Sequence, residues 1–180
     1  MGADRGILIE TDKFQDSIMT ARALSKVIME DGRPDIIFTG RESIDSEGMQ
    51  TMFRLAANLG IPVATNVIKF SYVNGKVRVE CETEPGSMVV LEMTTPCVIG
   101  TAKRLNTPRY PTFPDIVKAR KKEMKTTPMA SLHIPLPDSA LDIVELKPAV
   151  EKRQPEELKG TPMEVVKKLI SILEKRAKVI

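Results

Sequence analysis

The sequence predicts an α/β fold with a doubly wound, mostly parallel sheet, an antiparallel hairpin extension and a carboxyl-terminal arm ending in a helix. Three observations predict it. Two short apolar runs, Gly6–Ile9 and Asp35–Thr39, flank a stretch with helical periodicity, as in a β-α-β unit. Between Val67 and Met93 the apolar period changes to two, which is typical of antiparallel strands. Beyond Thr126 the chain is rich in proline and has no sustained periodicity before a final amphipathic segment.

Composition excludes several classes of protein. The 180 residues suffice for one domain with an appendage. A net charge of +3 is too small to favour nucleic-acid binding. Cys81 and Cys97 have neither paired metal-ligand spacing nor a histidine nearby in sequence, so we expect two core residues in a reducing compartment. No apolar run reaches membrane-spanning length and no signal peptide precedes the first strand, so the expected location is the cytoplasm, or the mitochondrial matrix in a eukaryote.

The first β-α-β unit runs from Gly6 to Thr39. A helix is predicted to open at Asp16 or Ser17, and the polar turn Asp31–Pro34 leads into the second strand. A right-handed crossover would make the two strands parallel. The apolar residues expected on one face of this helix are Ile18, Ala21, Leu24, Val27 and Ile28.

The segment after the second strand has the pattern of a loop that opens a helix. Gly40 ends the strand, and a helix is predicted to begin near Ser46 or Glu47 and to stop at Gly60. The amino end of the helix would face the loop, where free N–H groups and the helix dipole favour an anion. A phosphate or a flavin diphosphate could then bind around Gly48–Thr51. The alternative is an ordinary βα turn without a ligand. The apolar residues at helical spacing are Met49, Met52, Phe53, Leu55, Ala56 and Leu59.

The middle of the chain predicts a further parallel strand at Ile61–Val67 and then an antiparallel meander. Asn74-Gly75 and Glu84–Gly86 are the expected turns, and Asn-Gly is a strong hairpin signal. Another strand is expected at Cys97–Gly100. The three strands of the meander are predicted at Val67–Tyr72, Lys76–Glu82 and Met88–Met93.

The segment Arg104–Lys125 combines prolines with clustered basic residues. It predicts a surface loop that enters a short helix at Asp115. Composition alone leaves two interpretations open, a solvated helix face and a protein docking surface.

The predicted arm spans Thr126–Pro155, with one short strand at Leu141–Leu146. The lone His133 is expected to be an ordinary polar contact. Thr161 should cap the last helix, which has proline at its first position and glutamate at its third. Its apolar face needs another surface to cover, either a partner or this chain's own sheet. That face consists of Val165, Val166, Leu169, Ile170 and Leu173.

Two motifs resemble a known family, the beta subunits of electron transfer flavoproteins. Residues 40–51, GRESIDSEGMQT, are similar to that family's nucleotide loop, G-K/R-Q-x-I-D-x-D-x-x-Q-T/V. Residues 104–122, RLNTPRYPTFPDIVKARKK, are similar to its segment R-L-N-x-P-R-Y-x-x-L-P-x-I-x-K-A-x-K-K. Gly2–Arg5 also matches the G-A-D-R before the family's third strand, so the resemblance covers nearly the whole chain.

The resemblance implies a Rossmann-like sheet of the adenine-nucleotide-binding type and an electron carrier rather than an enzyme. In the family, two further strands come before the matched part in sequence, and in the sheet they lie between the Gly6 strand and the Asp35 strand. We therefore expect this chain to be a carboxyl-terminal portion of a subunit. FAD would be held mainly by an alpha subunit, while the loop would hold AMP, or a second FAD in electron-bifurcating members. The implied nucleotide residues are Gly40, Arg41, Glu42, Ser43, Ile44, Asp45, Ser46, Glu47, Gly48, Met49, Gln50 and Thr51.

The resemblance also implies a partner-docking role for residues 104–125, which recognise acyl-CoA-type or other flavin dehydrogenases in the family. Phe113 stands where an anchoring leucine is usual in this segment. In the nucleotide loop, Ser46 replaces the usual acidic residue and Met49 replaces the usual Asn or Ala. Residues 1–125 would form the nucleotide-binding domain, and 126–180 an arm and helix packing on the alpha subunit. The implied docking residues are Arg109, Tyr110, Phe113, Pro114, Lys118, Lys121 and Lys122.

Two other functions stay open at this point. The same architecture could serve an adenylating or hydrolytic enzyme that handles adenine nucleotides. It could also be an interaction module that binds an alpha subunit but no nucleotide. The sequence shows no general base, metal cluster or nucleophile, so no catalytic residue and no metal ligand is predicted, and the electron carrier is favoured.

Overall fold

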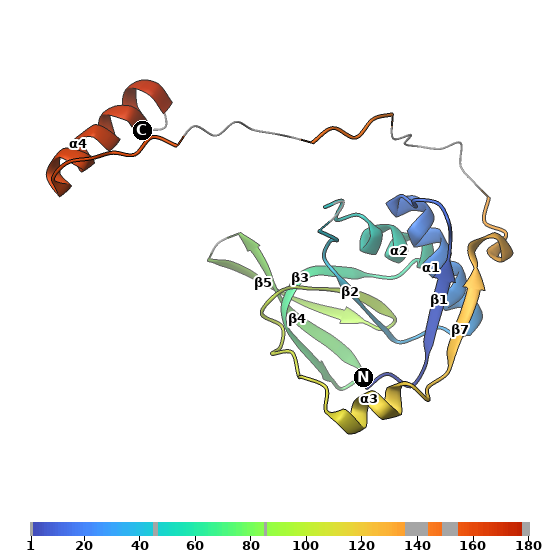
Figure 1. The fold of residues 1–180 in the computed structure, drawn as a ribbon. Helices are drawn as coiled ribbons and strands as arrows, with labels where there is room; N and C mark the ends of the chain where they lie inside the picture. Colours follow the sequence, from blue (N-terminus) through green and yellow to red (C-terminus); the bar gives the residue numbers. More distant parts are fainter. Residues whose placement is uncertain (1, 45–46, 85, 136–143, 149–154, 178–180) are drawn as a thin grey trace. The chain divides into compact units, whose positions relative to one another are not determined.

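The computed structural model describes the chain except for residues 1, 45–46, 85, 136–143, 149–154 and 178–180 (Figure 1). It divides into two compact units, Met1–Leu141 and Asp142–Ile180, which are described separately. Two sheets and three α-helices make up most of the first unit, and one α-helix is the main element of the second.

The first unit contains a five-stranded sheet in the order β2-β6-β3-β4-β5 and a two-stranded sheet, β1-β7 (Figure 1). The pairs β2-β6, β6-β3 and β1-β7 are parallel, whereas β3-β4 and β4-β5 are antiparallel. The predicted α/β fold with a mostly parallel sheet and a hairpin extension is therefore confirmed. The strands are β1 Gly6–Glu10, β2 Ile36–Gly40, β3 Val63–Val73, β4 Lys76–Glu84, β5 Ser87–Thr94, β6 Cys97–Thr101 and β7 Met124–Pro128.

Strand β3 corrects the sequence prediction, because the parallel strand and the first meander strand are one continuous element. Its first part pairs with β6 and its second part with β4, and Val67 is paired with both Thr101 and Cys81. The register shifts on both sides of Val67, and Asn66 has a left-handed backbone with φ 54°. A bulge of this kind bends and twists a strand, which allows one strand to belong to both halves of the sheet.

Strands β1 and β2 do not pair with each other, although helix α1 (Ser17–Asp31) connects them. Within the described residues β1 pairs with β7 alone and β2 with β6 alone. One edge of each strand is thus open, at the place where the family resemblance implies two further strands. Strand β7 also corrects the prediction that an extended arm starts at Thr126. Residues 124–128 instead pair with β1 and satisfy its backbone hydrogen-bonding groups. Thr126 and Thr127 are β-branched, which favours a strand.

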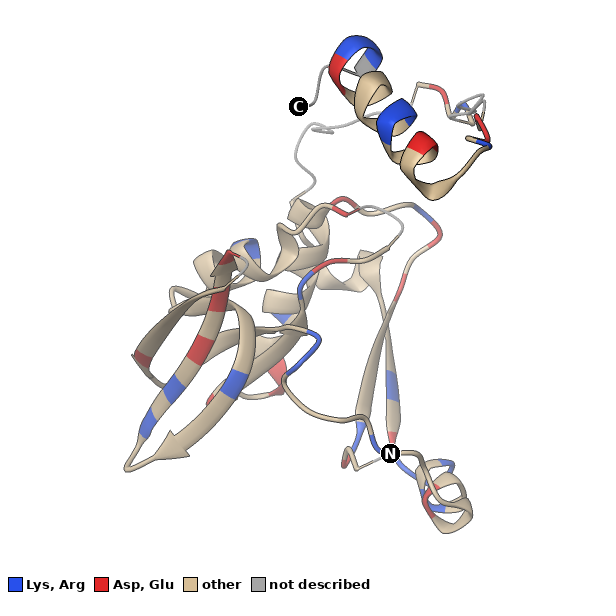
Figure 2. Cartoon of the chain, turned by 90° about the vertical axis from the view of Figure 1, so that its left-hand side faces the viewer, with Lys and Arg blue, Asp and Glu red and all other residues tan. Residues whose placement is uncertain are grey.

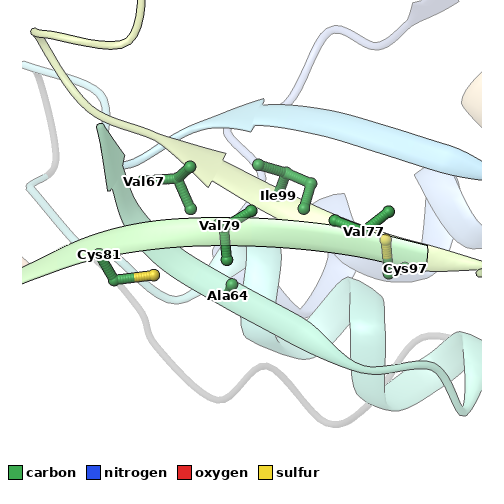
Figure 3. Close-up of a cluster of buried hydrophobic side chains, with 7 residues drawn as sticks. All are labelled: Ala64, Val67, Val77, Val79, Cys81, Cys97 and Ile99. Carbon is green, nitrogen blue, oxygen red and sulfur yellow. The ribbon is translucent and has the colours of Figure 1, made fainter. Parts of the chain in front are cut away.

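The core of the first unit lies on both faces of β6, whose residues Cys97, Val98, Ile99 and Gly100 are all buried. Burial on both faces is the expected environment of a central parallel strand. On one face a cluster of aliphatic and cysteine side chains joins β3, β4 and β6 (Figure 3). Each fully buried valine or isoleucine stabilises the fold by about 1.5–3 kcal/mol. The cluster consists of Ala64, Val67, Val77, Val79, Cys81, Cys97 and Ile99.

Helix α2 (Thr51–Leu59) covers the other face of β6. Met52 and Ala56 pack against Val98. Gly60, with φ 66°, ends the helix in a left-handed conformation, as predicted, and its N–H donates to the carbonyl of Ala57. The two cysteines are free and buried, and burial raises the pKa of each thiol, so the prediction that both are core residues is confirmed.

Helix α1 begins where the sequence predicts. The Asp16 carboxylate accepts a hydrogen bond from the Met19 N–H at 2.8 Å, which caps the helix. The predicted buried face is only partly right. Ala21 is buried, but the other buried positions are Met19 and Ala23, while the remaining predicted face residues are half-buried. α1 and α2 pack side by side in the first unit.

The second unit contains helix α4 (Pro162–Ile172), which continues as a short π-helical stretch, Leu173–Ala177. Thr161 and Glu164 form the predicted capping box. Val144–Leu146 is not a strand, contrary to prediction, and Leu141–Ile143 lies outside the described residues. Four apolar side chains of α4, Met163, Val166, Leu169 and Ile170, are exposed. Among the described residues no helix has the length and apolar character needed to cross a membrane.

Candidate functional site

The carboxyl ends of three parallel strand segments meet at one edge of the five-stranded sheet. Gly40 of β2 and Val67 of β3 are both paired with Thr101 of β6. The Thr101 hydroxyl donates to the Thr39 carbonyl at 2.9 Å, which ties the ends of β6 and β2 together. In open α/β sheets ligands bind outside this edge, so the loop that starts at Gly40 leaves the sheet at a position suited to binding.

The backbone of this loop delays the start of α2. Glu47 and Met49 have left-handed φ values of 45° and 50°, which are incompatible with a right-handed helix. α2 therefore begins at Thr51, and the prediction that it begins near Ser46 or Glu47 is wrong. Gln50 occupies the N-cap position without a side-chain cap. The positive end of the helix dipole is thus directed at the loop, and the Gln50 side chain does not cap it.

The other predicted nucleotide residues are exposed around this helix end. Residues 40–44 and 47–50 are all exposed, and Thr51 is partly buried. The Glu47 N–H donates to the Ser43 carbonyl at 2.9 Å and closes the loop. The Arg41 guanidinium is held by the Glu42 carboxylate, with one nitrogen at 3.1 Å. Ile44 is 93% exposed, so it is not a core residue. Asp45 and Ser46 lie outside the described residues.

A cavity of about 380 Å³ adjoins the loop, and Arg41, Asn66 and Lys103 are among its lining residues. Sequence reasoning missed Asn66. Its Oδ1 atom is buried without a hydrogen-bond partner among the described residues. The signal available in the sequence was its amide side chain near the end of the mostly apolar predicted strand Ile61–Val67. Uncompensated burial of an acceptor is costly, so an unpaired amide oxygen in a residue that lines a cavity fits a site that receives a hydrogen-bond donor.

Short helix α3 (Phe113–Ala119) carries several of the predicted docking residues. It begins two residues before the predicted start at Asp115, because Thr112 caps it and Pro114 suits the first turn, where no N–H partner is needed. Phe113 is 78% exposed and Tyr110 is 94% exposed. Two large exposed aromatic side chains on one segment are consistent with the predicted contact role.

Basic residues gather on α3 and the turn after it, in the helix beside the amino terminus in Figure 2. Lys118 and Lys121 are exposed. Lys122 differs from them, since its ammonium donates to the backbone carbonyl of Ala3. Of the predicted docking residues, Lys122 thus uses its side chain in a contact within the first unit. The others lie together on one exposed segment: Arg109, Tyr110, Phe113, Pro114, Lys118 and Lys121.

Contacts at both ends hold this segment on the domain. Arg104 forms an ion pair with Glu82 of β4. At the other end the Gly6 N–H donates to the Glu123 carbonyl at 2.9 Å. These contacts join the predicted docking segment to both sheets, and the side chains of Tyr110 and Phe113 between them are exposed.

The strand order and the open loop define a Rossmann-like α/β protein with a candidate ligand edge and a separate contact segment. Residues 1–132 match the family model of the electron transfer flavoprotein domain. The chain is 32% identical over 181 residues to electron transfer flavoprotein subunit beta of Bradyrhizobium diazoefficiens, covering 100% of this chain and 69% of the relative. It is 33% identical to the mitochondrial subunit beta of Arabidopsis thaliana with the same coverage, and 31% identical to subunit beta of Mus musculus, covering 97% and 67%. The chain therefore belongs to the electron transfer flavoprotein family, as its motifs predict.

Proposed function

We propose that this chain acts as the beta subunit of a heterodimeric electron transfer flavoprotein. It would pass electrons between flavin dehydrogenases and downstream acceptors as a carrier rather than as an enzyme. Family membership supports the electron-transfer role. The observation that carries the proposal is the uncapped amino end of α2 at the carboxyl edge of the parallel strands, next to a loop that matches the family's nucleotide loop.

The loop would hold AMP or a second FAD. Its residues fit such a group, because the helix end without a side-chain cap from Gln50 and the Arg41 guanidinium suit a phosphate, and the unpaired Asn66 amide oxygen suits a donor of the ligand. Gln50 and Thr51 would add side-chain hydrogen bonds, each contributing about 1.5–3 kcal/mol to a charged acceptor. AMP would be structural, whereas a second FAD would supply a second redox centre. The redox FAD would be held mainly by the alpha subunit.

The α3 segment would dock the dehydrogenase. Phe113 is an exposed apolar anchor, and Lys118 and Lys121 are exposed cations beside it. A buried aromatic anchor supplies affinity, and surrounding charges mainly raise the association rate with an acidic partner. Lys122, which contacts Ala3, would act instead by holding the segment in place.

The second unit would pack on the alpha subunit. Its described part offers an amphipathic helix whose apolar side chains are exposed. Such a face is stabilised by covering it with another apolar surface. The complex would operate in the cytoplasm, or in the mitochondrial matrix in a eukaryote.

Analysis of the nucleotides released from the purified complex with the alpha subunit tests this proposal. AMP or an additional FAD would support it. A complex without nucleotide at this loop would indicate an interaction module, and release of a chemically altered nucleotide would indicate an enzyme. The chain purified alone should carry no yellow flavin, so a stoichiometric flavin absorbance in that preparation contradicts the assignment of FAD to the alpha subunit.

A further inference from the structure

The turn between β3 and β4 consists of a chemically reactive pair of residues. β3 ends at Val73 and β4 begins at Lys76, so Asn74 and Gly75 alone connect the two strands. Both have left-handed backbones, with φ 52° and 79°, as the favoured two-residue hairpin turns require. An asparagine amide is labile because the next backbone nitrogen can attack its side-chain carbon and close a five-membered ring. Glycine has no β-carbon to hinder this attack, so Asn74-Gly75 joins a labile amide to an unhindered nucleophile.

The structure leaves the backbone nitrogen of Gly75 accessible. Asn74 and Gly75 are both exposed. A β-carbon placed on Gly75 would meet nothing within 4 Å, so the space around the nitrogen is open. The Gly75 N–H has no hydrogen-bond partner in the part of the chain that the structure describes. A base in the solvent can therefore remove its proton without first breaking a hydrogen bond.

Positively charged side chains lie beside the reacting groups. Asn74, Lys76 and Arg78 line one concave surface of about 540 Å³ on the antiparallel strands. Lys76 pairs at 2.6 Å with Glu92, which lines the same surface. Arg78 forms no ion pair within the described residues. A nearby positive charge favours both the anionic nitrogen that starts the reaction and the carboxylate that ends it.

The other asparagines of the chain lack this combination. Asn58 lies within α2 and Asn66 within β3, where helix and strand pairing hold the backbone. Asp31-Gly32 shares the small neighbour, but Arg5 pairs with the Asp31 carboxylate at 2.6 Å. This contact keeps the carboxylate ionised, and an anion resists nucleophilic attack. The three other asparagines are all followed by residues with hindering side chains: Leu59 after Asn58, Val67 after Asn66 and Thr107 after Asn106.

We propose that Asn74 is a site of spontaneous deamidation, which converts the tip of the β3–β4 hairpin into aspartate and isoaspartate forms. The deprotonated nitrogen of Gly75 attacks Cγ of Asn74 and forms a new C–N bond. The Cγ–Nδ2 bond breaks, and ammonia leaves after taking up a proton equivalent to the one that Gly75 lost. Water then opens the ring, giving aspartate by addition at Cγ and isoaspartate by addition at the backbone carbonyl carbon. Water is the only co-reactant, and nothing is oxidised or reduced.

The two products have different effects on the hairpin. Aspartate tolerates a left-handed backbone, and Asp-Gly is itself a favoured turn, so this form keeps Val73 paired with Lys76. Isoaspartate adds one carbon atom to the backbone, so the turn no longer fits that register. The pair at the end of the two strands then opens, and the ion pair between Lys76 and Glu92 loses its fixed geometry. Deamidation thus adds a negative charge in both forms but releases the tip in only one of them.

Ageing of the full chain in mildly alkaline buffer, followed by peptide mapping, tests the proposal. The peptide that contains Asn74 should acquire aspartate and isoaspartate forms before the peptides of Asn58, Asn66 and Asn106. The rate should rise about tenfold for each unit of pH, since the deprotonated fraction of the Gly75 nitrogen rises in that proportion. Asn74→Gly keeps a favoured turn dipeptide and should abolish the added charge. Conversion of another asparagine before Asn74, an Asn74 that stays intact, or a rate independent of pH overturns the proposal.

Hydrogen exchange of the separated products tests the release of the tip. The amides of Val73 and Lys76 should exchange faster in the isoaspartate form than in Asn74→Asp, which adds the same charge without the extra backbone atom. Equal exchange in these two proteins overturns the structural half of the proposal. Neither measurement depends on nucleotide or on an alpha subunit, so the proposed function stands or fails separately.

Discussion

Thr112 and Asp115 cap each other at the start of α3. The Thr112 hydroxyl donates to the Asp115 carboxylate at 2.6 Å, and the Thr112 N–H donates to the same oxygen at 3.1 Å. The Asp115 N–H completes the box with a bond to the Thr112 hydroxyl oxygen at 3.4 Å. Phe113 lies between them at the first helical position. The box therefore fixes the backbone that presents the exposed aromatic ring.

Thr112→Ala should weaken docking of the dehydrogenase on α3, although Thr112 is not one of the side chains that we assign to that contact. Loss of an N-cap costs about 1 kcal/mol of helix stability, and a helix of seven residues has little stability of its own. The apparent dissociation constant for the dehydrogenase should rise by roughly fivefold. Titration of the heterodimer with the dehydrogenase measures it, with Thr107→Ala as the control in the same segment. An equal effect of both substitutions would contradict the role of the cap.

The capping box also predicts a titration. The hydrogen bond from the Thr112 hydroxyl, followed by that from its N–H, lowers the pKa of Asp115 below its ordinary 3.8. Because the folded pKa is depressed, the stabilisation is complete above about 3.8 and is lost as pH falls through the lower folded value. NMR titration of the carboxyl carbon should show the low midpoint, and Thr112→Ala should return it toward 3.8. The same midpoint in both proteins would rule out this cause.

Phe113→Ala should impair electron transfer with the dehydrogenase and leave assembly with the alpha subunit intact. Truncating an aromatic anchor at an interface costs about 2 kcal/mol or more, and a side chain that is 78% exposed contributes little to folding. Reaction rates at limiting dehydrogenase provide the measurement. Tyr72→Ala removes an aromatic ring that is 54% exposed, on β3, and is the control. Equal rates for wild type and Phe113→Ala would count against docking through α3.

Gly48→Val with Gln50→Ala should strip nucleotide from the heterodimer. A side chain at Gly48 would obstruct the approach of a phosphate to the loop backbone, and the second change removes a hydrogen-bonding amide. Stability should fall as well, since a ligand present at 100 times its dissociation constant stabilises the folded state by about 2.7 kcal/mol. Nucleotide content and melting temperature are the measurements. Full nucleotide with an unchanged melting temperature would show that the loop is only a βα turn.

Gly100→Ala should destabilise the first unit by about 1–3 kcal/mol through overpacking. A methyl group there would collide with the Met52 sulfur of α2 and lie 3.3 Å from the Ala64 carbonyl oxygen. Gly2→Ala, which meets nothing within 4 Å, is the control and should leave stability unchanged. Chemical denaturation compares the three proteins. If Met52→Leu does not reduce the penalty of Gly100→Ala, the collision with the sulfur is not its cause.

Local patterns predicted the helix ends that depend on a single cap. Asp16, Gly60 and Thr161 were all identified from sequence, because each satisfies backbone groups within its own turn. The continuity of β3 could not be predicted in this way. Both halves have strand periodicity, and only the pairing of Val67 with two different neighbours shows that they are one strand.

The features of the candidate site also fall into two groups, those that a local motif predicts and those that depend on the folded backbone. The family motif predicts a role for Gly40–Thr51 and Phe113, and that role stays a prediction. The late start of α2 depends on the left-handed backbone of Met49, which residue type does not favour. Asn66 lies outside the motif, at the bulge in β3, and lines the cavity together with Arg41 of the loop. Strand β7 was missed because its pairing with β1 joins residues more than a hundred positions apart.

The central position of β6 has a consequence for the order of folding during synthesis. The hairpins formed by β3, β4 and β5 have short loops and can form as soon as Thr94 has left the ribosome. β2 and β3 have no partner for their parallel edges until Cys97–Thr101 emerges and inserts between them. The antiparallel half of the sheet can thus form early in the nascent chain, whereas the parallel half cannot form until β6 is available. A pause in translation after Thr101 has left the ribosome should therefore favour correct closure of the sheet, whereas a pause before that point prolongs the exposure of two unpaired strand edges.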